Sequence, residues 1–365
     1  MYIGVPKERR PFECRVGLPP AGVEILVEQG HTVYVEHEAG LGAGFSDQEY
    51  EQAGARLVYS THEVFGRAEL VCKIARPLQE EIGWMQPETT LLGYLHLAST
   101  RQDRIDALLE KKITAIAYEQ IQLPDGSLPV LRPLSQIGGL MTAQIAARFM
   151  QNNFGGKGIL LGGIAGVPPA EVVILGAGVA GLSAAKAFLG AGAHVTLLDR
   201  SMEALQRAAD TLPLAVTMIA SRRNIERACQ FADVVVGAIL VPGDRTPVIV
   251  SREVVRSMKP RSLIIDLSID QGGCFETSRP TMHDRPTYFE EGVIHYCVPN
   301  IPGVVGRTST HAFINAAMLY ILEIAGGVQQ AIASNPAIAA AVNTHQGQLV
   351  NLKRVNIPGG SDGLE

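Results

Sequence analysis

The most specific spacing of chemically useful residues lies in a glycine-rich segment near the middle of the chain. Gly176, Gly178 and Gly181 follow the apolar run 172–175 and open a segment rich in small residues. Glycines at this spacing permit a tight turn, close approach of a pyrophosphate and close packing of a following helix, whose N-terminus attracts the anion. Asp199 lies 18 residues beyond Gly181, where a carboxylate accepts the ribose 2′-hydroxyl of NAD. The segment therefore predicts an NAD site.

Two other interpretations of this segment stay open. Arg200 follows Asp199 directly and would allow some binding of NADP, although the carboxylate itself repels the extra phosphate. The glycines could also form a turn in a sheet that binds no nucleotide.

A second set of polar residues falls on or just after the carboxyl ends of predicted strands, the edge at which open α/β sheets bind ligands. The first half of the chain contributes Arg15, Lys73 and His96. The second half contributes Asp270 and Asn300. Arginine binds carboxylates in a bidentate manner, and histidine transfers protons near neutral pH. If two domains face one cleft, these groups would converge on a nicotinamide ring.

Each of these residues also has a purely structural interpretation. Arg15 could pair with Glu8 or Glu13 at the surface. His96 could be a capping or hydrogen-bonded core residue, and Asp270 could belong to a turn before the glycine pair that follows it. The other eight of the nine histidines have no acidic or cysteine partner at metal-ligand spacing, so no metal site is predicted.

Alternating strand and helix signals would position these residues. The first 120 residues contain predicted strands at 2–6, 32–36, 56–59, 70–75, 90–95 and 114–118, and predicted helices at 21–29, 47–53 and 100–110. A second series of strands begins at Val172 and continues at 194–198, 215–220, 233–238, 262–267 and 295–298. This alternation predicts parallel sheets with right-handed crossovers. The expected fold class is α/β, with two doubly wound, Rossmann-like domains and a cleft between them.

The order of these signals along the chain predicts a discontinuous domain division. A long helix at 137–151 and a glycine-rich stretch at 155–169 separate the two series. A helix at 310–325, with no strand predicted after it, and an alanine-rich helical tail at 337–341 would return the chain to the first domain. We therefore predict a substrate domain at 1–135 plus 307–365 and an NAD-binding domain at 136–306.

Composition excludes several classes of protein. The 365 residues are 47% hydrophobic and 18% charged, which is enough apolar sequence to bury two cores. Thirty-one basic and 36 acidic residues are spread without blocks, so nucleic acid is not an expected partner. The five cysteines form no CxxC pair. The chain opens in a strand without a signal-peptide pattern, and the apolar stretch 312–327 is too short to span a membrane. A cytoplasmic protein is predicted.

The sequence resembles the alanine dehydrogenases, which share their architecture with the soluble NAD-binding part of proton-translocating transhydrogenase. The resemblance extends over nearly the whole chain. The motifs that carry it are at 4–8, 13–16, 94–98, 117–119, 241–243, 269–276, 298–302 and 334–336.

The resemblance implies an NAD-dependent oxidoreductase of amino acid metabolism that acts on CH–NH2 donors. It would aminate pyruvate with NADH and ammonia, and oxidise L-alanine in reverse. Arg15 would hold the substrate carboxylate, and His96 would move a proton to and from the carbonyl or carbinolamine oxygen. Asp270 would assist ammonia or water, and Asn300 would line the nicotinamide site. Members of this family are typically homohexamers built from dimers.

The resemblance also implies a set of cofactor contacts beyond the glycine turn. They are Ser135, Val179, Ala180, Asp199, Ile239, Leu240, Leu267, Ser268, Ile269, Asp270, Arg279, Val298, Asn300 and Ile301.

One position departs from the family pattern. The family carries a lysine that binds the pyruvate carbonyl oxygen, and this chain has Ala75 in that place. Loss of one such donor costs roughly 10²–10³ in rate. Lys73 lies on the same strand face but about 6.6 Å further back. Arg76 points to the other face of a regular strand, although the turn at Pro77 could swing it inward.

Three hypotheses follow from Ala75. The chain is an alanine dehydrogenase that uses Lys73 or Arg76, or a family member for another amino or oxo acid, or an NAD-binding protein that acts through assembly or regulation. The presence of Arg15, His96 and Asp270 argues against the third, because a protein without chemistry has no need of all three.

Overall fold

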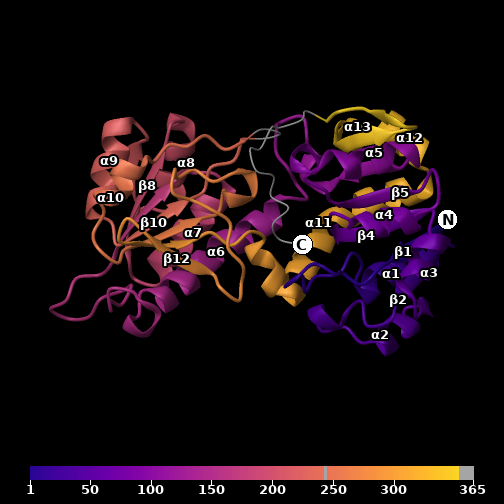
Figure 1. Cartoon of the computed structure of the whole chain (residues 1–365), viewed down its shortest axis with the longest axis horizontal. Coiled ribbons are helices and arrows are strands. Elements are labelled where there is room, and N and C mark those ends of the chain that lie inside the picture. The colour runs from indigo at the N-terminus through magenta and orange to yellow at the C-terminus, as the bar shows by residue number, and fades with distance from the viewer. Residues whose placement is uncertain (242–244, 353–365) are drawn as a thin grey trace. The chain divides into compact units, whose positions relative to one another are not determined.

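The computed structural model of the chain describes residues 1–241 and 245–352. The chain divides into two compact units (Figure 1). Unit 1 comprises Met1–Leu134 and Pro302–Glu365, and unit 2 comprises Ser135–Ile301. Pro242 and Gly243, which end the motif at 241–243, lie outside the described residues.

Unit 1 is built on a mixed sheet. Among the described residues its eight strands are β1 (Tyr2–Val5), β2 (Thr32–Glu36), β3 (Arg56–Val58), β4 (Leu70–Ala75), β5 (Thr90–Tyr94), β6 (Thr114–Ala117), β14 (Val342–His345) and β15 (Gln348–Leu349). Their order across the sheet is β15-β14-β6-β5-β4-β1-β2-β3. The six predicted strands of this series are confirmed, with ends that differ by at most one residue, and β1 to β6 pair in parallel.

The prediction that no strand follows the helix at 310–325 was wrong. β14 pairs with β6 in the antiparallel direction, and β15 pairs with β14. The sequence Val-Asn-Thr-His of β14 does not alternate apolar and polar residues, so it gives no strand signal. Its buried polar side chains are stabilised by hydrogen bonds instead. The Thr344 hydroxyl donates to the carbonyl of Ile113 at 2.8 Å, and the Asn343 amide donates to Gln120 at 2.6 Å. These partners come from distant parts of the chain, so sequence periodicity does not reveal them.

The helices of unit 1 include several too short for a clear periodic signal. They are α1 (Pro20–Glu28), α2 (Asp47–Gln52), α3 (Thr61–Arg67), α4 (Gln79–Trp84), α5 (Gln102–Glu110), α11 (Gly306–Gly326), α12 (Val328–Ser334) and α13 (Pro336–Ala341). α3 and α4 were not predicted. α2 begins one residue after its N-cap, Ser46, whose hydroxyl accepts from the backbone of Glu49 in a capping box.

Unit 2 also contains a mostly parallel sheet. Its strands among the described residues are β7 (Glu171–Leu175), β8 (His194–Asp199), β9 (Val216–Ile219), β10 (Val234–Gly237), β11 (Leu263–Asp266), β12 (Thr287–Glu290) and β13 (Val293–Tyr296). Their order is β12-β13-β11-β10-β7-β8-β9. The strand predicted at 295–298 begins two residues earlier. β12 was not predicted; it pairs antiparallel to β13 at the edge of the sheet, where its residues are only partly buried.

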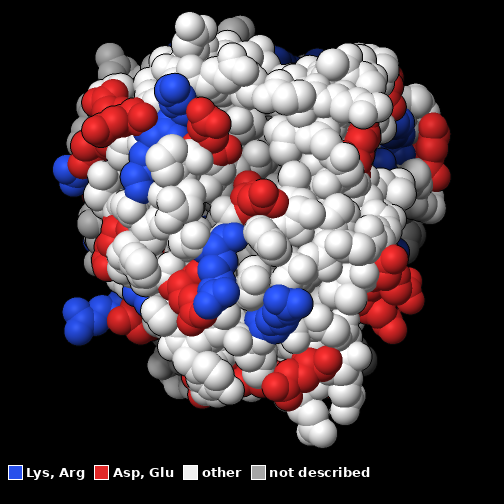
Figure 2. Space-filling view, turned by 90° about the vertical axis from the view of Figure 1, so that its right-hand side faces the viewer, with Lys and Arg blue, Asp and Glu red and all other residues white. Residues whose placement is uncertain are grey.

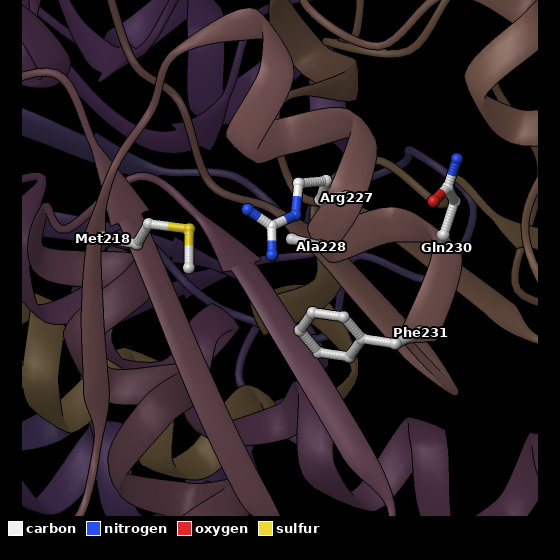
Figure 3. A pocket seen from close by; sticks show the side chains of 5 residues that line it. All are labelled: Met218, Arg227, Ala228, Gln230 and Phe231. Atoms are coloured by element: carbon white, nitrogen blue, oxygen red, sulfur yellow. The ribbon is translucent and has the colours of Figure 1, made fainter.

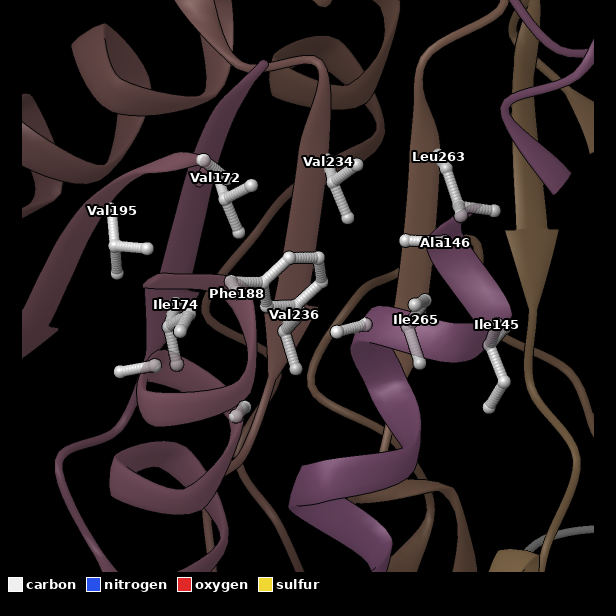
Figure 4. Close-up of a cluster of buried hydrophobic side chains, with 14 of the residues drawn as sticks. Ile145, Ala146, Val172, Ile174, Phe188, Val195, Val234, Val236, Leu263 and Ile265 are labelled. Atoms are coloured by element: carbon white, nitrogen blue, oxygen red, sulfur yellow. The ribbon is translucent and has the colours of Figure 1, made fainter. Parts of the chain in front are cut away.

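Both faces of this sheet are covered, which explains why its central strands β7, β10 and β11 are almost entirely apolar. The covering helices are α6 (Arg132–Phe149), α7 (Val179–Gly190), α8 (Met202–Thr211), α9 (Arg222–Phe231) and α10 (Arg252–Arg256). On one face, Val172, Val236 and Ile265 pack with Phe188 of α7 and Ala146 of α6 (Figure 4). The other residues of the same strands pack on the opposite face with α9 and α10. The result is the predicted doubly wound arrangement.

α6 begins five residues before the predicted start at 137. Pro133 lies in its first turn, where a missing backbone N–H removes no helical hydrogen bond. Of the described helices, none alone is long and apolar enough to span a membrane; α11 and α12 reach that limit only as a pair bent by 118°. On the face drawn in Figure 2, basic and acidic side chains lie beside one another with uncharged surface between them.

Candidate active site

In unit 1, the predicted site residues gather at the carboxyl ends of neighbouring strands. Arg15 lies in the loop after β1, Lys73 lies on β4, Arg76 follows β4, and His96 follows β5. β1, β4 and β5 are adjacent in the sheet. Parallel strands therefore carry Arg15, Arg76 and His96 to one edge, as expected for a ligand site.

Arg15 is buried, with 5% of its surface exposed. Its Nε and Nη2 donate to the two carboxylate oxygens of Glu13 at 2.7 and 2.5 Å. Burial alone lowers the pKa of Arg15, but the charge and hydrogen bonds of Glu13 outweigh it and raise that pKa. The Glu13 pair suggested by the sequence is thus present, in the interior rather than at the surface. A guanidinium held in this bidentate manner is fixed in orientation and charge.

His96 is held in a backbone conformation that only a few non-glycine residues adopt. Its φ and ψ are 44° and 41°, in the left-handed region. Its N–H donates to Glu119 at 2.6 Å, and the N–H of Leu95 donates to the other oxygen of the same carboxylate at 3.1 Å. The imidazole is half-exposed, and its Nδ1 lies 3.8 Å from Glu119. Glu119, which follows β6, therefore fixes the turn that presents the imidazole.

Lys73 lies in an ionic cluster inside the sheet rather than at its edge. The side chain is 1% exposed, and its ammonium lies 3.1 Å from a carboxylate oxygen of each of Glu8 and Glu81. Burial alone lowers the pKa of Lys73, but the two glutamates outweigh it and raise that pKa. The ammonium is therefore charged and held between two carboxylates.

Arg76 is connected to the His96 turn. Its Nη1 lies 3.4 Å from the Thr100 hydroxyl, which donates to the carbonyl of His96 at 3.2 Å. Ala75, immediately before it, is half-buried, and its N–H donates to Glu8 at 3.3 Å.

In unit 2, the glycine turn after β7 has the shape that a dinucleotide requires. A Cβ on Gly181 would lie 1.8 Å from the carbonyl oxygen of Gly176, so only glycine allows α7 to pack this close to the turn. Gly178 is the exposed N-cap of α7, and a Cβ there would meet no atom within 4 Å. The first turn of α7 has no side-chain cap and no acidic residue. Open space over free backbone N–H groups fits a pyrophosphate, so these residues fit NAD.

Asp199, at the end of β8, is tied to that turn. One carboxylate oxygen accepts from the N–H of Ala177 at 2.7 Å, and the other accepts from Ser201 at 2.8 Å. Each carboxylate oxygen has a second lone pair, which remains able to accept a ribose hydroxyl. The half-buried carboxylate is thus positioned by the backbone before any ligand binds.

The loops after β10, β11 and β13 are also connected to one another. The Ser268 hydroxyl accepts from the N–H of Ile239 at 2.9 Å. The exposed Asp270 lies 3.5 Å from the N–H of Asn300, whose φ of 55° is left-handed. These contacts bring predicted cofactor residues from three neighbouring strands to one edge of the sheet.

A buried aspartate that the sequence did not single out anchors the Asp270 loop. Asp266, the last residue of β11, is fully buried and accepts from the N–H groups of Ser268 and Cys274, both at 3.0 Å, and from the Ser278 hydroxyl. Burial raises the pKa of Asp266, although these hydrogen bonds oppose it. The only sequence signal for this residue is an acidic side chain at the end of an apolar strand.

The remaining predicted cofactor residues differ in exposure. Arg279 is exposed, with its guanidinium 3.9 Å from the ring centre of Tyr288. Leu240 is also exposed. The half-buried positions are Ser135, Val179, Ala180, Ile239 and Leu267, and the buried positions are Ser268, Ile269, Val298 and Ile301.

A hollow of about 290 Å³ on unit 2 lies away from these residues. It is lined by Met218, Arg227, Ala228, Gln230 and Phe231, from β9 and α9 (Figure 3). None of them is a predicted site residue. Within the described residues, no group of three His, Cys, Asp or Glu side chains is placed to hold a metal ion.

Comparison with known proteins gives matches over almost the whole chain. The model of the alanine dehydrogenase/PNT N-terminal domain matches residues 4–138, and that of the C-terminal domain matches residues 142–352. Alanine dehydrogenase of Methanococcus maripaludis is 49% identical over 96% of this chain and 94% of its own length. Alanine dehydrogenase of Mycolicibacterium smegmatis is 43% identical over 96% and 95%.

Solved structures give the same result. An L-alanine dehydrogenase superposes with a TM-score of 0.91 and 44% identity, covering 96% of this chain and 97% of that one. The transhydrogenase from Sinorhizobium meliloti superposes with a TM-score of 0.81 and 25% identity, covering 96% and 99%.

Proposed function

We propose that this chain, which belongs to the alanine dehydrogenase/PNT family, is an NAD-dependent alanine dehydrogenase that interconverts L-alanine with pyruvate and ammonia. The family resemblance inferred from the sequence motifs and the α/β fold are both confirmed. The observation that carries the proposal lies in unit 1. A buried, oriented guanidinium and a half-exposed imidazole lie at the same edge of one sheet, as carboxylate binding and proton transfer require.

Each residue of unit 1 has a distinct role in this proposal. Arg15 binds the substrate carboxylate, and Glu13 fixes the orientation of its guanidinium. His96 donates a proton to the carbonyl or carbinolamine oxygen in amination and takes it back in alanine oxidation. Glu119 is a positioning residue, because it holds the turn of His96 through two backbone N–H groups.

The residues of unit 2 hold the cofactor and assist ammonia. NAD would supply the hydride acceptor for alanine oxidation, and NADH would supply the hydride donor for amination. Gly178 and the N-terminus of α7 hold the pyrophosphate, and Asp199 accepts a ribose hydroxyl. Asp270 orients ammonia or water, and Asn300 lines the nicotinamide site. The loops that carry both residues are fixed by Asp266 and Ser268.

In the family, a lysine at the position of Ala75 binds the pyruvate carbonyl oxygen. In this chain the positive charge for that contact would come from Arg76 rather than from Lys73. The Lys73 ammonium is enclosed by two carboxylates, and moving it to a substrate would leave both of them buried and unpaired. Arg76 follows Ala75 directly and contacts the turn of His96 through Thr100. We therefore assign it the contact with the carbonyl oxygen.

Replacement of His96 tests the function directly. His96→Asn should lower kcat of alanine oxidation by roughly 10²–10⁴, the usual contribution of a general acid–base group. The dissociation constant of NADH, measured by fluorescence titration, should not change. His62→Asn, on α3, is the matched control. A variant at position 96 that keeps wild-type kcat would contradict the role assigned to the imidazole.

We also infer a homo-oligomer, either a hexamer or a dimer, which light scattering of the purified protein tests. A monomer at micromolar concentration would be inconsistent with this inference. The cytoplasmic location stays a prediction.

A further inference from the structure

Three arginines from separate elements of unit 1 lie together beside the position of Ala75. Arg10 is in the loop after β1, Arg76 follows β4, and Arg104 is in the first half of α5. The Nε of Arg10 donates to the carbonyl of Arg76 at 3.2 Å. Burial, together with the like charges of Arg76 and Arg104, lowers the pKa of Arg10 to about 10. Arg76 and Arg104 are thus the like charges that act on Arg10.

The cluster contains an unsatisfied donor. The Nη2 of Arg10 is buried and has no hydrogen-bond partner among the described residues. The acidic residues that act on Arg10 are Glu81 and Glu8, and both of these carboxylates are already paired with Lys73. Buried donors are nearly always hydrogen-bonded in folded proteins, and guanidiniums prefer carboxylates in bidentate geometry. An oxyanion at this position would therefore be strongly stabilised.

The cluster adjoins both catalytic features of unit 1. The carbonyl of Arg10 accepts from the N–H of Glu13, the residue that holds Arg15. Arg76 contacts Thr100, which in turn bonds to His96. The cluster is thus connected to Arg15 and to His96 by short chains of contacts, and Arg76 directly follows Ala75, which stands where the family has a lysine.

We propose that Arg10 and Arg104, beside Arg76, bind a second carboxylate on the substrate side chain, so that the enzyme takes short dicarboxylic 2-oxo acids and their amino acids in addition to pyruvate and alanine. The proposal rests on the proposed function, because it uses the same site. The reaction is also the same. The carbonyl oxygen leaves as water, the ammonia nitrogen bonds to that carbon, and the carbon takes a hydride from NADH, which is oxidised to NAD⁺. The second carboxylate is unchanged.

The test compares a dicarboxylate with a monocarboxylate of similar size. Malonate and propionate are titrated into the NADH-bound protein by calorimetry, which requires no turnover, and both are then used as inhibitors of pyruvate amination. Malonate should bind at least about tenfold more tightly than propionate, since one additional charge-assisted bidentate contact is worth about that factor. The amination of 2-oxoglutarate with NADH is measured in parallel and should exceed that of 2-oxobutyrate.

Substitutions in the arginine cluster test whether it causes the preference for malonate over propionate. Arg10→Gln and Arg104→Gln should each reduce the malonate-to-propionate ratio about tenfold, and Arg10→Lys should reduce it less because charge is kept. Arg101→Gln is the matched control, since Arg101 is an exposed neighbour on the same segment and pairs with Asp103 at 3.1 Å. The malonate-to-propionate ratio of the Arg101→Gln variant should equal that of the wild type. Thermal melts identify any variant that does not fold.

The outcomes separate the two proposals. Pyruvate amination without any preference for malonate would overturn the second carboxylate site and leave the proposed function intact. A preference for malonate without pyruvate turnover would support the site and contradict alanine dehydrogenase activity. If inorganic phosphate binds as tightly as malonate and does not compete with pyruvate, the cluster binds free anions, and the proposed substrate class is wrong.

Discussion

At the scale of single residues, carboxylates hold the predicted catalytic groups of unit 1. Glu13 fixes the guanidinium of Arg15, and Glu119 fixes the turn of His96. The sequence suggested Glu13 or Glu8 as a partner of Arg15, but at the surface. It gave no role to Glu119, which is 23 residues from His96 and meets it only because β5 and β6 are neighbours in the sheet.

Glu119→Gln tests the positioning role. The amide keeps only one acceptor oxygen for two backbone N–H groups, so the His96 turn loosens. We expect kcat to fall roughly tenfold to a hundredfold, while KM for pyruvate and the dissociation constant of NADH stay unchanged. Steady-state kinetics measure kcat and KM, and fluorescence titration measures the dissociation constant of NADH. Glu110→Gln, exposed at the end of α5, is the control. A change in KM alone would contradict the role.

The substitution Lys73→Met distinguishes a structural role of Lys73 from a role in binding the substrate. Removal of the ammonium leaves Glu8 and Glu81 buried without a counter-charge, so the free energy of unfolding should fall by about 3–5 kcal/mol. Urea denaturation measures this, with the exposed Lys112→Met as control. If stability is unchanged and KM for pyruvate rises instead, Lys73 reaches the substrate and Arg76 does not replace the family lysine.

At the scale of elements, the strands and the glycine turn were predictable, and the contacts between distant segments were not. Apolar runs bounded by turn residues predict the central strands of both sheets, such as β4, β5, β10 and β11, because these are buried on both faces. β12 and β14 lack that signal, since one is a partly exposed edge and the other is held by polar side chains. The arginine cluster depends in the same way on three elements meeting, which no local pattern encodes.

A pair of glycine variants tests the turn after β7. Gly178→Ala places a methyl group in open space, so the stability of the protein should not change, but the affinity for NADH should fall at least tenfold because the pyrophosphate loses its closest approach. Gly181→Ala should instead destabilise the protein by about 1–3 kcal/mol through the clash with Gly176. NADH titration and thermal melts measure both. Wild-type NADH affinity in Gly178→Ala would mean that the pyrophosphate binds elsewhere.

For the molecule as a whole, the free energy of unfolding should decrease at low pH because of a histidine outside the site. His295 on β13 is fully buried, its Nε2 lies 2.8 Å from the Thr277 hydroxyl, and its ring stacks on Tyr288. Burial lowers the pKa of His295 to about 4. Between about pH 6.5 and pH 4, the His295 imidazole therefore stays neutral in the folded protein. In the unfolded chain the same imidazole is protonated with its ordinary pKa of about 6.5.

The sign of the effect follows from that difference. The stabilisation is complete above about pH 6.5 and is lost as pH falls toward 4, by up to about 3 kcal/mol in the free energy of unfolding. His295→Phe should flatten the decline in melting temperature over this range. Exposed His194, which pairs with Glu171, provides the control His194→Gln. An equally steep decline in His295→Phe would assign the acid sensitivity to other groups.

The most direct measurement of the activity is the stoichiometry of pyruvate amination by the purified wild-type protein. NADH, pyruvate and ammonium are supplied together and then with each one omitted, and the product is identified by chiral chromatography. We predict one L-alanine formed for each NADH oxidised, and no oxidation when pyruvate or ammonium is left out. NADH that binds but yields no L-alanine, at any pyruvate concentration, would contradict alanine dehydrogenase activity.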